Sequence, residues 1–149
     1  LLVPSTKIAL DYLFISDDRL EFVSFTCMKR VLIIDDNADF GRMLRASIED
    51  DLECEVTVFE NGERGLVHLE NHGADLVITD LLMPGKDGLE LIMDMRKRFS
   101  NVAVFAVSGG GDFDTRCELE IAEKLGARGF CKPLPMGRFL SAVRDVLAA

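Results

Sequence analysis

The chain has 149 residues, of which 48% are hydrophobic, so it can bury one sizeable core but not the cores of two full domains. Its 26 acidic residues outnumber its 17 basic residues and give a net charge of −9, which repels a phosphate backbone, so we expect no nucleic-acid partner. No apolar run approaches the roughly 18 residues of a membrane helix and no secretory signal pattern is visible, so we expect a soluble, cytoplasmic protein.

Residues 1–27 do not follow the pattern of the rest of the chain. Ile8–Ser16 and Arg19–Phe25 are strand-like runs separated by Asp17 and Asp18, so this N-terminal extension can form a β-hairpin. A lone hairpin is only marginally stable in water and needs a surface on which to pack. Three alternatives stay open: a non-native or loosely ordered leader, an element packed on the following domain, and a partner-binding strand.

From residue 28 onward, short apolar runs alternate with amphipathic stretches, and a turn or capping residue stands at each transition. This alternation is typical of repeated β-α units around a parallel sheet whose two faces are both covered. The sequence therefore predicts an α/β domain over residues 28–149 with five such units. The strands are expected at Arg30–Asp35, Cys54–Phe59, Leu76–Thr79, Val102–Val107 and Gly129–Cys131.

The first and last predicted helices each carry an apolar stripe with helical spacing, and the first should begin near Asn37. Such stripes indicate faces that pack on the core. In the first helix the stripe consists of Phe40, Met43, Leu44 and Ile48. In the last helix it consists of Phe139, Leu140, Val143, Val146 and Leu147.

Three of the predicted strands end in charged side chains. VLIIDD ends in Asp35 and Asp36, LVITD ends in Asp80 just before a Met-Pro-Gly turn, and FCK ends in Lys132. In an open parallel sheet, ligand sites form beyond the carboxyl ends of the strands, which share one edge. We therefore expect these side chains to lie close together, with Asp80 pointing out of the sheet edge rather than into the core.

A cluster of three carboxylates requires a cation, because two ionised carboxylates about 4 Å apart repel by roughly 4 kcal/mol at an effective dielectric near 20. Oxygen ligands with room for water suit Mg²⁺, and Mn²⁺ can substitute. With the cation in place, Asp80 can act as a nucleophile toward phosphorus. Lys132 would supply a compact positive charge, and Ser108, which ends the run VAVFAVS, would offer a hydroxyl to a phosphoryl oxygen.

The motifs VLIIDD, DLVITDLLMPGKDG, VFAVSGGG and GFCKPL stand in an order and spacing that resembles the receiver domain of two-component response regulators. The resemblance covers residues 29–149 and implies a flavodoxin-like fold, a doubly wound five-stranded parallel sheet with five helices and strand order 2-1-3-4-5. It also implies that Asp80 is the phosphoacceptor. Mg²⁺ would be bound by Asp36, Asp80 and the backbone carbonyl of Leu82, with Asp35 acting through bound water.

The same resemblance implies a switch and its partners. Ser108 would be the hydroxyl switch residue and Phe130 the aromatic that changes rotamer. Lys132 would bind the phosphoryl group, and the Lys132–Pro133 peptide bond would be cis. A histidine kinase or histidine phosphotransfer protein would act upstream of a single-domain regulator. A downstream protein would bind the face of the fourth helix, fifth strand and fifth helix, and a homodimer is a further option. This chain departs from the family at two positions: it has Phe130 where the family often has tyrosine, and Gly109 where alanine is common.

Two other functions compete with a phosphorylated receiver. A phosphohydrolase of the haloacid dehalogenase type needs a second acid two residues after the nucleophile, where this chain has Leu82, so turnover of phosphate esters is not expected. The alternative is a pseudo-receiver, a protein-interaction module that is never phosphorylated, and the full set of site residues argues against it. We therefore expect a switch with Mg²⁺-dependent self-phosphorylation and autodephosphorylation, not an enzyme with an independent substrate.

Overall fold

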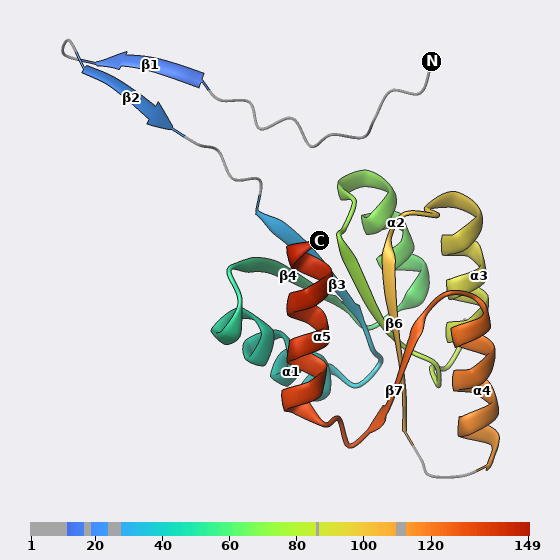
Figure 1. Ribbon diagram of the computed structural model, residues 1–149. Helices are drawn as coiled ribbons and strands as arrows, with labels where there is room; N and C mark the ends of the chain where they lie inside the picture. The colour runs from blue at the N-terminus through green and yellow to red at the C-terminus, as the bar shows by residue number, and fades with distance from the viewer. Residues whose placement is uncertain (1–11, 17–18, 24–27, 86, 110–112) are drawn as a thin grey trace.

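The computed structural model describes residues 12–16, 19–23, 28–85, 87–109 and 113–149. Near the N-terminus, β1 (Tyr12–Ser16) pairs antiparallel with β2 (Arg19–Val23) in a two-stranded sheet of their own, which lies apart from the other elements in Figure 1. These strands fall inside the two runs expected to form a hairpin. The outer ends of those runs, residues 8–11 and 24–25, lie outside the described residues.

The main body is a five-stranded parallel sheet in the order β4-β3-β5-β6-β7, which is 2-1-3-4-5 when its strands are counted along the chain. The predicted doubly wound, flavodoxin-like architecture is therefore confirmed. Its strands are β3 (Lys29–Ile34), β4 (Cys54–Phe59), β5 (Leu76–Asp80), β6 (Ala103–Gly109) and β7 (Arg128–Lys132). Its helices are α1 (Ala38–Asp51), α2 (Gly62–His72), α3 (Gly88–Arg98), α4 (Phe113–Lys124) and α5 (Met136–Ala148).

The helices cover both faces of this sheet, with α1 and α5 on one face and α2, α3 and α4 on the other (Figure 1). Successive residues of a strand point to opposite faces, so each central strand contributes to two cores. On β3, Val31 and Ile33 pack with α1 and α5, whereas Leu32 and Ile34 pack with the other three helices. Burial on both faces explains why the strands read as continuous apolar runs.

Three strands, β5, β6 and β7, extend further at their carboxyl ends than the sequence predicted, whereas β3 ends one residue earlier, at Ile34, and β4 ends where expected. Asp80 is the last residue of β5 and pairs with Val107, while Gly109 of β6 pairs with Lys132 of β7. These pairs continue the ladder past the apolar runs, because backbone hydrogen bonding does not depend on the polarity of the side chains. Asp80 and Lys132 are thus anchored in the sheet rather than in loops.

The apolar stripe of α1 also differs in one position. Met43 is 45% exposed, whereas Gly41, Leu44 and Ile48 are buried. A Cβ at Gly41 would lie 2.8 Å from Cγ1 of Val58, so the glycine allows α1 to lie close to β4 and sets which face points inward. Among the described residues, no helix is both long enough and apolar enough to cross a membrane.

Candidate functional site

Asp80 is held at the carboxyl end of β5 with little exposure to solvent. Only 6% of the residue is exposed, so the side chain lies in an enclosed site at this edge of the sheet rather than in open solvent. Its Oδ1 accepts a hydrogen bond from the backbone N–H of Leu82 at 3.0 Å, and the N–H of Leu81 donates to the carbonyl of Val107 at 2.9 Å. The loop therefore folds over Asp80, and Gly85 then turns the chain with a φ of 94°, a conformation that glycine adopts without strain.

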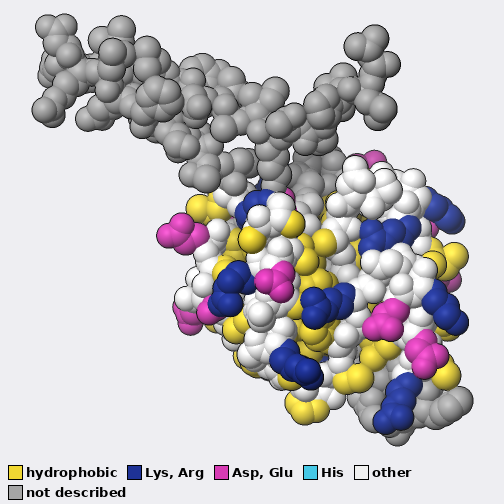
Figure 2. Space-filling view, in the orientation of Figure 1, with side chains coloured by type: hydrophobic (Ala, Val, Ile, Leu, Met, Phe, Trp, Pro, Cys, Tyr) yellow, Lys and Arg dark blue, Asp and Glu magenta, His cyan; other side chains and the backbone are white. Residues whose placement is uncertain are grey.

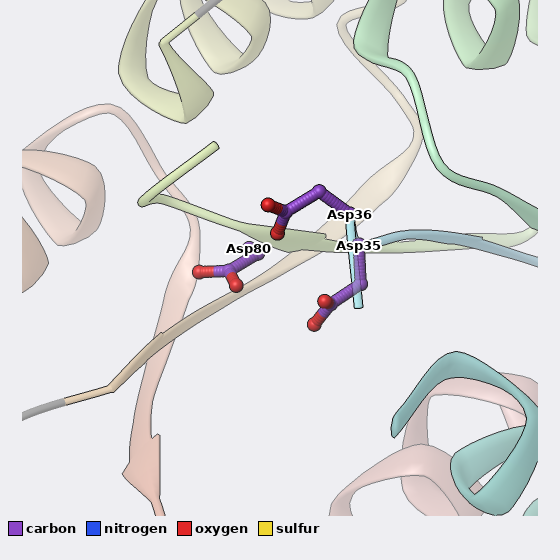
Figure 3. Close-up of side chains that lie close together, drawn as sticks. All are labelled: Asp35, Asp36 and Asp80. Atoms are coloured by element: carbon purple, nitrogen blue, oxygen red, sulfur yellow. The ribbon is translucent and has the colours of Figure 1, made fainter. Parts of the chain in front are cut away.

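The other two carboxylates directly follow β3. Asp35 is 2% exposed and Asp36 is exposed, and an oxygen of each lies within 4.8 Å of the others and of Asp80. Figure 3 shows the three side chains next to one another, at the ends of two neighbouring strands. Asp35 accepts a hydrogen bond from the N–H of Asn37 at 2.8 Å, and Asn37, not an aspartate, caps α1. Helix capping therefore does not explain the aspartate pair.

Lys132, the last residue of β7, connects two of these carboxylates. Its Nζ donates to Oδ2 of Asp35 at 2.9 Å and to Oδ2 of Asp80 at 3.0 Å. Burial favours the neutral amine, but the hydrogen bonds with both carboxylates outweigh it and raise the pKa of Lys132 above its ordinary value. The Lys132–Pro133 peptide bond is cis, the isomer that the resemblance implies.

Asp35 carries a pH dependence of its own. Burial raises the pKa of this carboxyl above its ordinary value of 3.8, although its hydrogen bonds with Lys132 and the Asn37 amide act in the opposite direction. The folded state then holds the proton more strongly than the unfolded chain does. The contribution of Asp35 to stability is therefore fully present below pH 3.8 and is lost as pH rises toward the raised pKa of this carboxyl.

We expect Asp35→Asn to be more stable than the natural chain at neutral pH when divalent cations are absent. Asparagine keeps an acceptor for the Asn37 amide but carries no buried charge. The free energy of unfolding of the variant should also vary less with pH above 3.8. Urea denaturation at a series of pH values measures both effects. A variant less stable than the natural chain at neutral pH would show that the attraction of Lys132 exceeds the cost of burying the carboxylate.

Ser108 lies on β6, the strand beside β5, and Phe130 lies on β7, the next strand along the sheet. Ser108 follows Val107, the residue paired with Asp80, and is fully buried. Its hydroxyl has no hydrogen-bond partner among the described residues, a situation that costs about 1–3 kcal/mol. The ring of Phe130 is half-buried and packs against the rings of Phe105 and Phe139, at centroid distances of 5.1 and 4.9 Å.

Three residues close to the site were not predicted to belong to it. Asn37 orients Asp35 and caps α1, and its position directly after the two aspartates was a usable signal. The ring of Phe40 lies 4.0 Å from Nζ of Lys132, and Gly88 lies against the backbone of Asp80. The first contact joins segments far apart in the sequence, and the second depends on the path of the loop between β5 and α3. No local sequence pattern therefore indicated either of them.

A family model described as the response regulator receiver domain matches residues 31–144. This chain belongs to the response regulator receiver family. Receiver domains are signalling switches in two-component systems rather than conventional enzymes, and they work with histidine kinases and downstream effectors. Members of this family bind Mg²⁺ in an acidic pocket. Two buried carboxylates, an exposed third one and a buried hydroxyl with no partner in the described part of the chain fit such a pocket.

Curated relatives include short and long proteins. The receiver is 28% identical over 122 residues to the chemotaxis protein CheY of Halobacterium salinarum, covering 81% of this chain and 98% of that protein. It is 38% identical over 121 residues to the KDP operon transcriptional regulatory protein KdpE of Escherichia coli, covering 80% of this chain and 52% of that protein. The chain thus spans nearly all of the first relative and about half of the second.

Solved structures agree with the fold. A response regulator receiver protein from Pseudomonas putida has a TM-score of 0.71 and 26% identity, covering 79% of this chain and 97% of the other. A receiver domain protein from Clostridium thermocellum has a TM-score of 0.72 and 27% identity, covering 81% and 95%.

Proposed function

We propose that this receiver accepts a phosphoryl group on Asp80 from a histidine kinase or a histidine phosphotransfer protein, in a Mg²⁺-dependent reaction, and that phosphorylation changes a surface that another protein binds. One observation carries the proposal. The Asp80 carboxylate lies within 4.8 Å of two other carboxylates and also accepts a hydrogen bond from Lys132. A cation and an ammonium can therefore both act on a phosphoryl group at this carboxylate.

In the transfer step, a carboxylate oxygen of Asp80 forms a bond with phosphorus. The bond between phosphorus and the donor's imidazole nitrogen breaks, and its electron pair stays on that nitrogen. Asp36, Asp80 and the carbonyl of Leu82 would hold Mg²⁺, with Asp35 acting through bound water; this ion, or Mn²⁺ in its place, supplies positive charge to the phosphoryl oxygens. Lys132 would exchange its hydrogen bond to Asp80 for one to a phosphoryl oxygen. Water attack at the same phosphorus would later restore Asp80.

Phosphorylated Asp80 carries close to two negative charges and strong acceptor oxygens. The hydroxyl of Ser108, which has no partner among the described residues, would donate to one of these oxygens. A movement of Ser108 would change the space available to Phe130, which lies opposite Val107 on the neighbouring strand. Rotation of the Phe130 ring would break its packing on Phe105 and Phe139 and alter the face formed by α4, β7 and α5.

This face would bind a downstream protein or a second copy of the receiver. Figure 2 shows part of it, with basic side chains interspersed among apolar and acidic ones. The groove beside β7 is lined by Arg128, Phe130, Cys131 and Arg138, among other residues. Since Phe130 lines this groove, a change in its rotamer would directly change the binding surface. The net charge of −9 favours a protein over a nucleic acid as the direct partner.

Intact-mass measurement tests the phosphoacceptor. With a small acyl phosphate and Mg²⁺, the natural chain should gain one phosphoryl group, whereas Asp80→Asn should gain none, and a chelator should prevent the gain. Asp145→Asn is the matched control, because Asp145 is an exposed aspartate on α5 and should not affect the reaction. If neither an acyl phosphate nor a phosphorylated histidine phosphotransfer domain modifies the natural chain, the pseudo-receiver alternative takes the place of this proposal.

A further inference from the structure

The Lys132 ammonium contacts an aromatic ring as well as the two carboxylates. Its Nζ lies 4.0 Å from the centroid of the Phe40 ring, in addition to the hydrogen bonds to Asp35 and Asp80 at 2.9 and 3.0 Å. A cation over an aromatic face is attracted by the negative potential of that face, and the attraction grows when water is excluded. The Lys132 side chain is only 21% exposed, so this contact is partly shielded from solvent.

Local structure fixes the position of the Phe40 ring. Asn37 caps α1 and accepts a hydrogen bond from the N–H of Phe40 at 3.1 Å, so Phe40 is held in the first turn of the helix. The N–H of the same Asn37 donates to Asp35 at 2.8 Å. The segment 35–40 therefore places both the Asp35 carboxylate and the face of the Phe40 ring next to Lys132. The two hydrogen bonds of Asn37 fix the position of Asp35 relative to Phe40.

The lysine needs such a restraint, because a surface groove lies beside it. Lys132 and Phe40 line this groove of about 590 Å³ together with Met43, Pro133, Leu134 and Met136. On the neighbouring strand β6, Gly109 is paired with Lys132, and a Cβ there would lie 3.6 Å from Cδ of Lys132. Because glycine has no Cβ, the aliphatic part of the lysine side chain lacks this packing contact. A Lys132 side chain that lost the ring contact would have room to move into the groove and away from Asp80.

We propose that Phe40 is a positioning residue for phosphoryl transfer, whose ring face holds the Lys132 ammonium beside Asp80. This inference rests on the proposed function of Asp80. Lys132 would replace an oxygen of Asp80 by a phosphoryl oxygen during transfer, and this exchange does not require it to break its contact with the ring. The ring thus keeps the charge in place while its hydrogen-bond partner changes.

A series of fluorinated phenylalanines at position 40 tests the proposal. Each added fluorine weakens the negative potential of the ring face while it changes the shape of the ring little. The rate of phosphorylation of Asp80 by a small acyl phosphate should fall stepwise along the series, by about 3- to 10-fold for the trifluoro ring. Phe40 also packs against the core around α1 and α5, and loss of that packing would not follow the number of fluorine atoms.

The same series at Phe99 is the matched control. The centroid of the Phe99 ring lies 5.3 Å from the guanidinium carbon of Arg98. Phe99 follows α3 and precedes β6, so it lies at the amino-terminal edge of the sheet, opposite the edge that holds Asp80. Fluorination there should leave the rate of phosphorylation unchanged. If the rate is also unchanged along the Phe40 series while Asp80 is phosphorylated, the positioning role is overturned.

A second readout does not depend on phosphorylation. Protons above a ring face are shifted upfield in NMR spectra, so the side-chain protons of Lys132 next to its Nζ should be shifted upfield by Phe40. Phe40→Leu should abolish this shift, and fluorination should reduce it stepwise as the contact weakens. A Lys132 spectrum that does not change in Phe40→Leu overturns the contact itself. If no chain is phosphorylated, the function proposed for Asp80 fails, whereas the NMR series still supports or overturns the contact.

Discussion

Replacing Lys132 with methionine should slow phosphoryl transfer to Asp80 by about 100-fold or more and should strengthen Mg²⁺ binding at the same site. Methionine keeps an apolar stem of similar length but has no charge. The ammonium lies 2.9 Å from Asp35 and 3.0 Å from Asp80, so its loss removes the positive charge available to the phosphoryl group. It also removes a cation that repels Mg²⁺ from the carboxylates. Stopped-flow phosphorylation and calorimetric titration with Mg²⁺ measure the two effects.

Without divalent cations, Lys132→Met should also lose about 2 kcal/mol of stability, because Asp35 and Asp80 stay buried without their shared partner. Mg²⁺ should restore part of this loss. The control is Lys29→Met, which removes one positive charge near Asp75 at the amino-terminal edge of the sheet, where the charge is 3.7 Å from the carboxylate. That variant should keep the natural transfer rate and Mg²⁺ affinity. A Lys132→Met protein that is phosphorylated at the natural rate would show that the lysine has no part in the transfer.

Replacing Gly88 with alanine should destabilise the receiver by about 3 kcal/mol, since overpacking against backbone atoms cannot be relieved by a side-chain rotation. Gly88 is the first residue of α3 and is buried. A Cβ there would lie 2.4 Å from the carbonyl oxygen of Asp80 and 2.5 Å from Cα of Leu81. Both atoms belong to the backbone that places the phosphoacceptor. Phosphorylation should therefore be slower even in the folded variant, and the melting temperature should fall by roughly 6–12 °C.

Gly137 offers a matched substitution. It lies in the first turn of α5, where an added Cβ would meet nothing within 4 Å. Gly137→Ala should raise stability by about 0.5–1 kcal/mol, because alanine loses less conformational entropy than glycine in a helix. Thermal unfolding of both variants by circular dichroism makes the comparison. Equal melting temperatures for Gly88→Ala and the natural chain would mean that α3 can move away from Asp80 at no cost.

The predicted helices and strands were wrong only in where some strands end and in which residue of α1 faces the core. Alternation of apolar and amphipathic segments correctly predicted five β-α units, because a strand covered on both faces must be apolar throughout. The spacing along α1 could not distinguish Met43 from Gly41 as the inward residue. That choice depends on how closely α1 approaches Val58 of β4, which is a property of the packed structure.

The sequence by itself determined which side chains meet at the site. Asp35, Asp36, Asp80 and Lys132 all stand at strand ends, and the carboxyl ends of parallel strands share one edge. This inference needs only the order of strands and turns, which local patterns reveal.

Only the tertiary structure decided how these side chains are held. The burial of Asp80, the burial of the Ser108 hydroxyl and the contact of the Phe40 ring with Lys132 depend on the packing of elements distant in sequence. The approach of Gly88 to the Asp80 carbonyl likewise depends on the path of the loop between β5 and α3. Periodicity records which face of an element is buried, but it carries no information about which atom of another element lies against it.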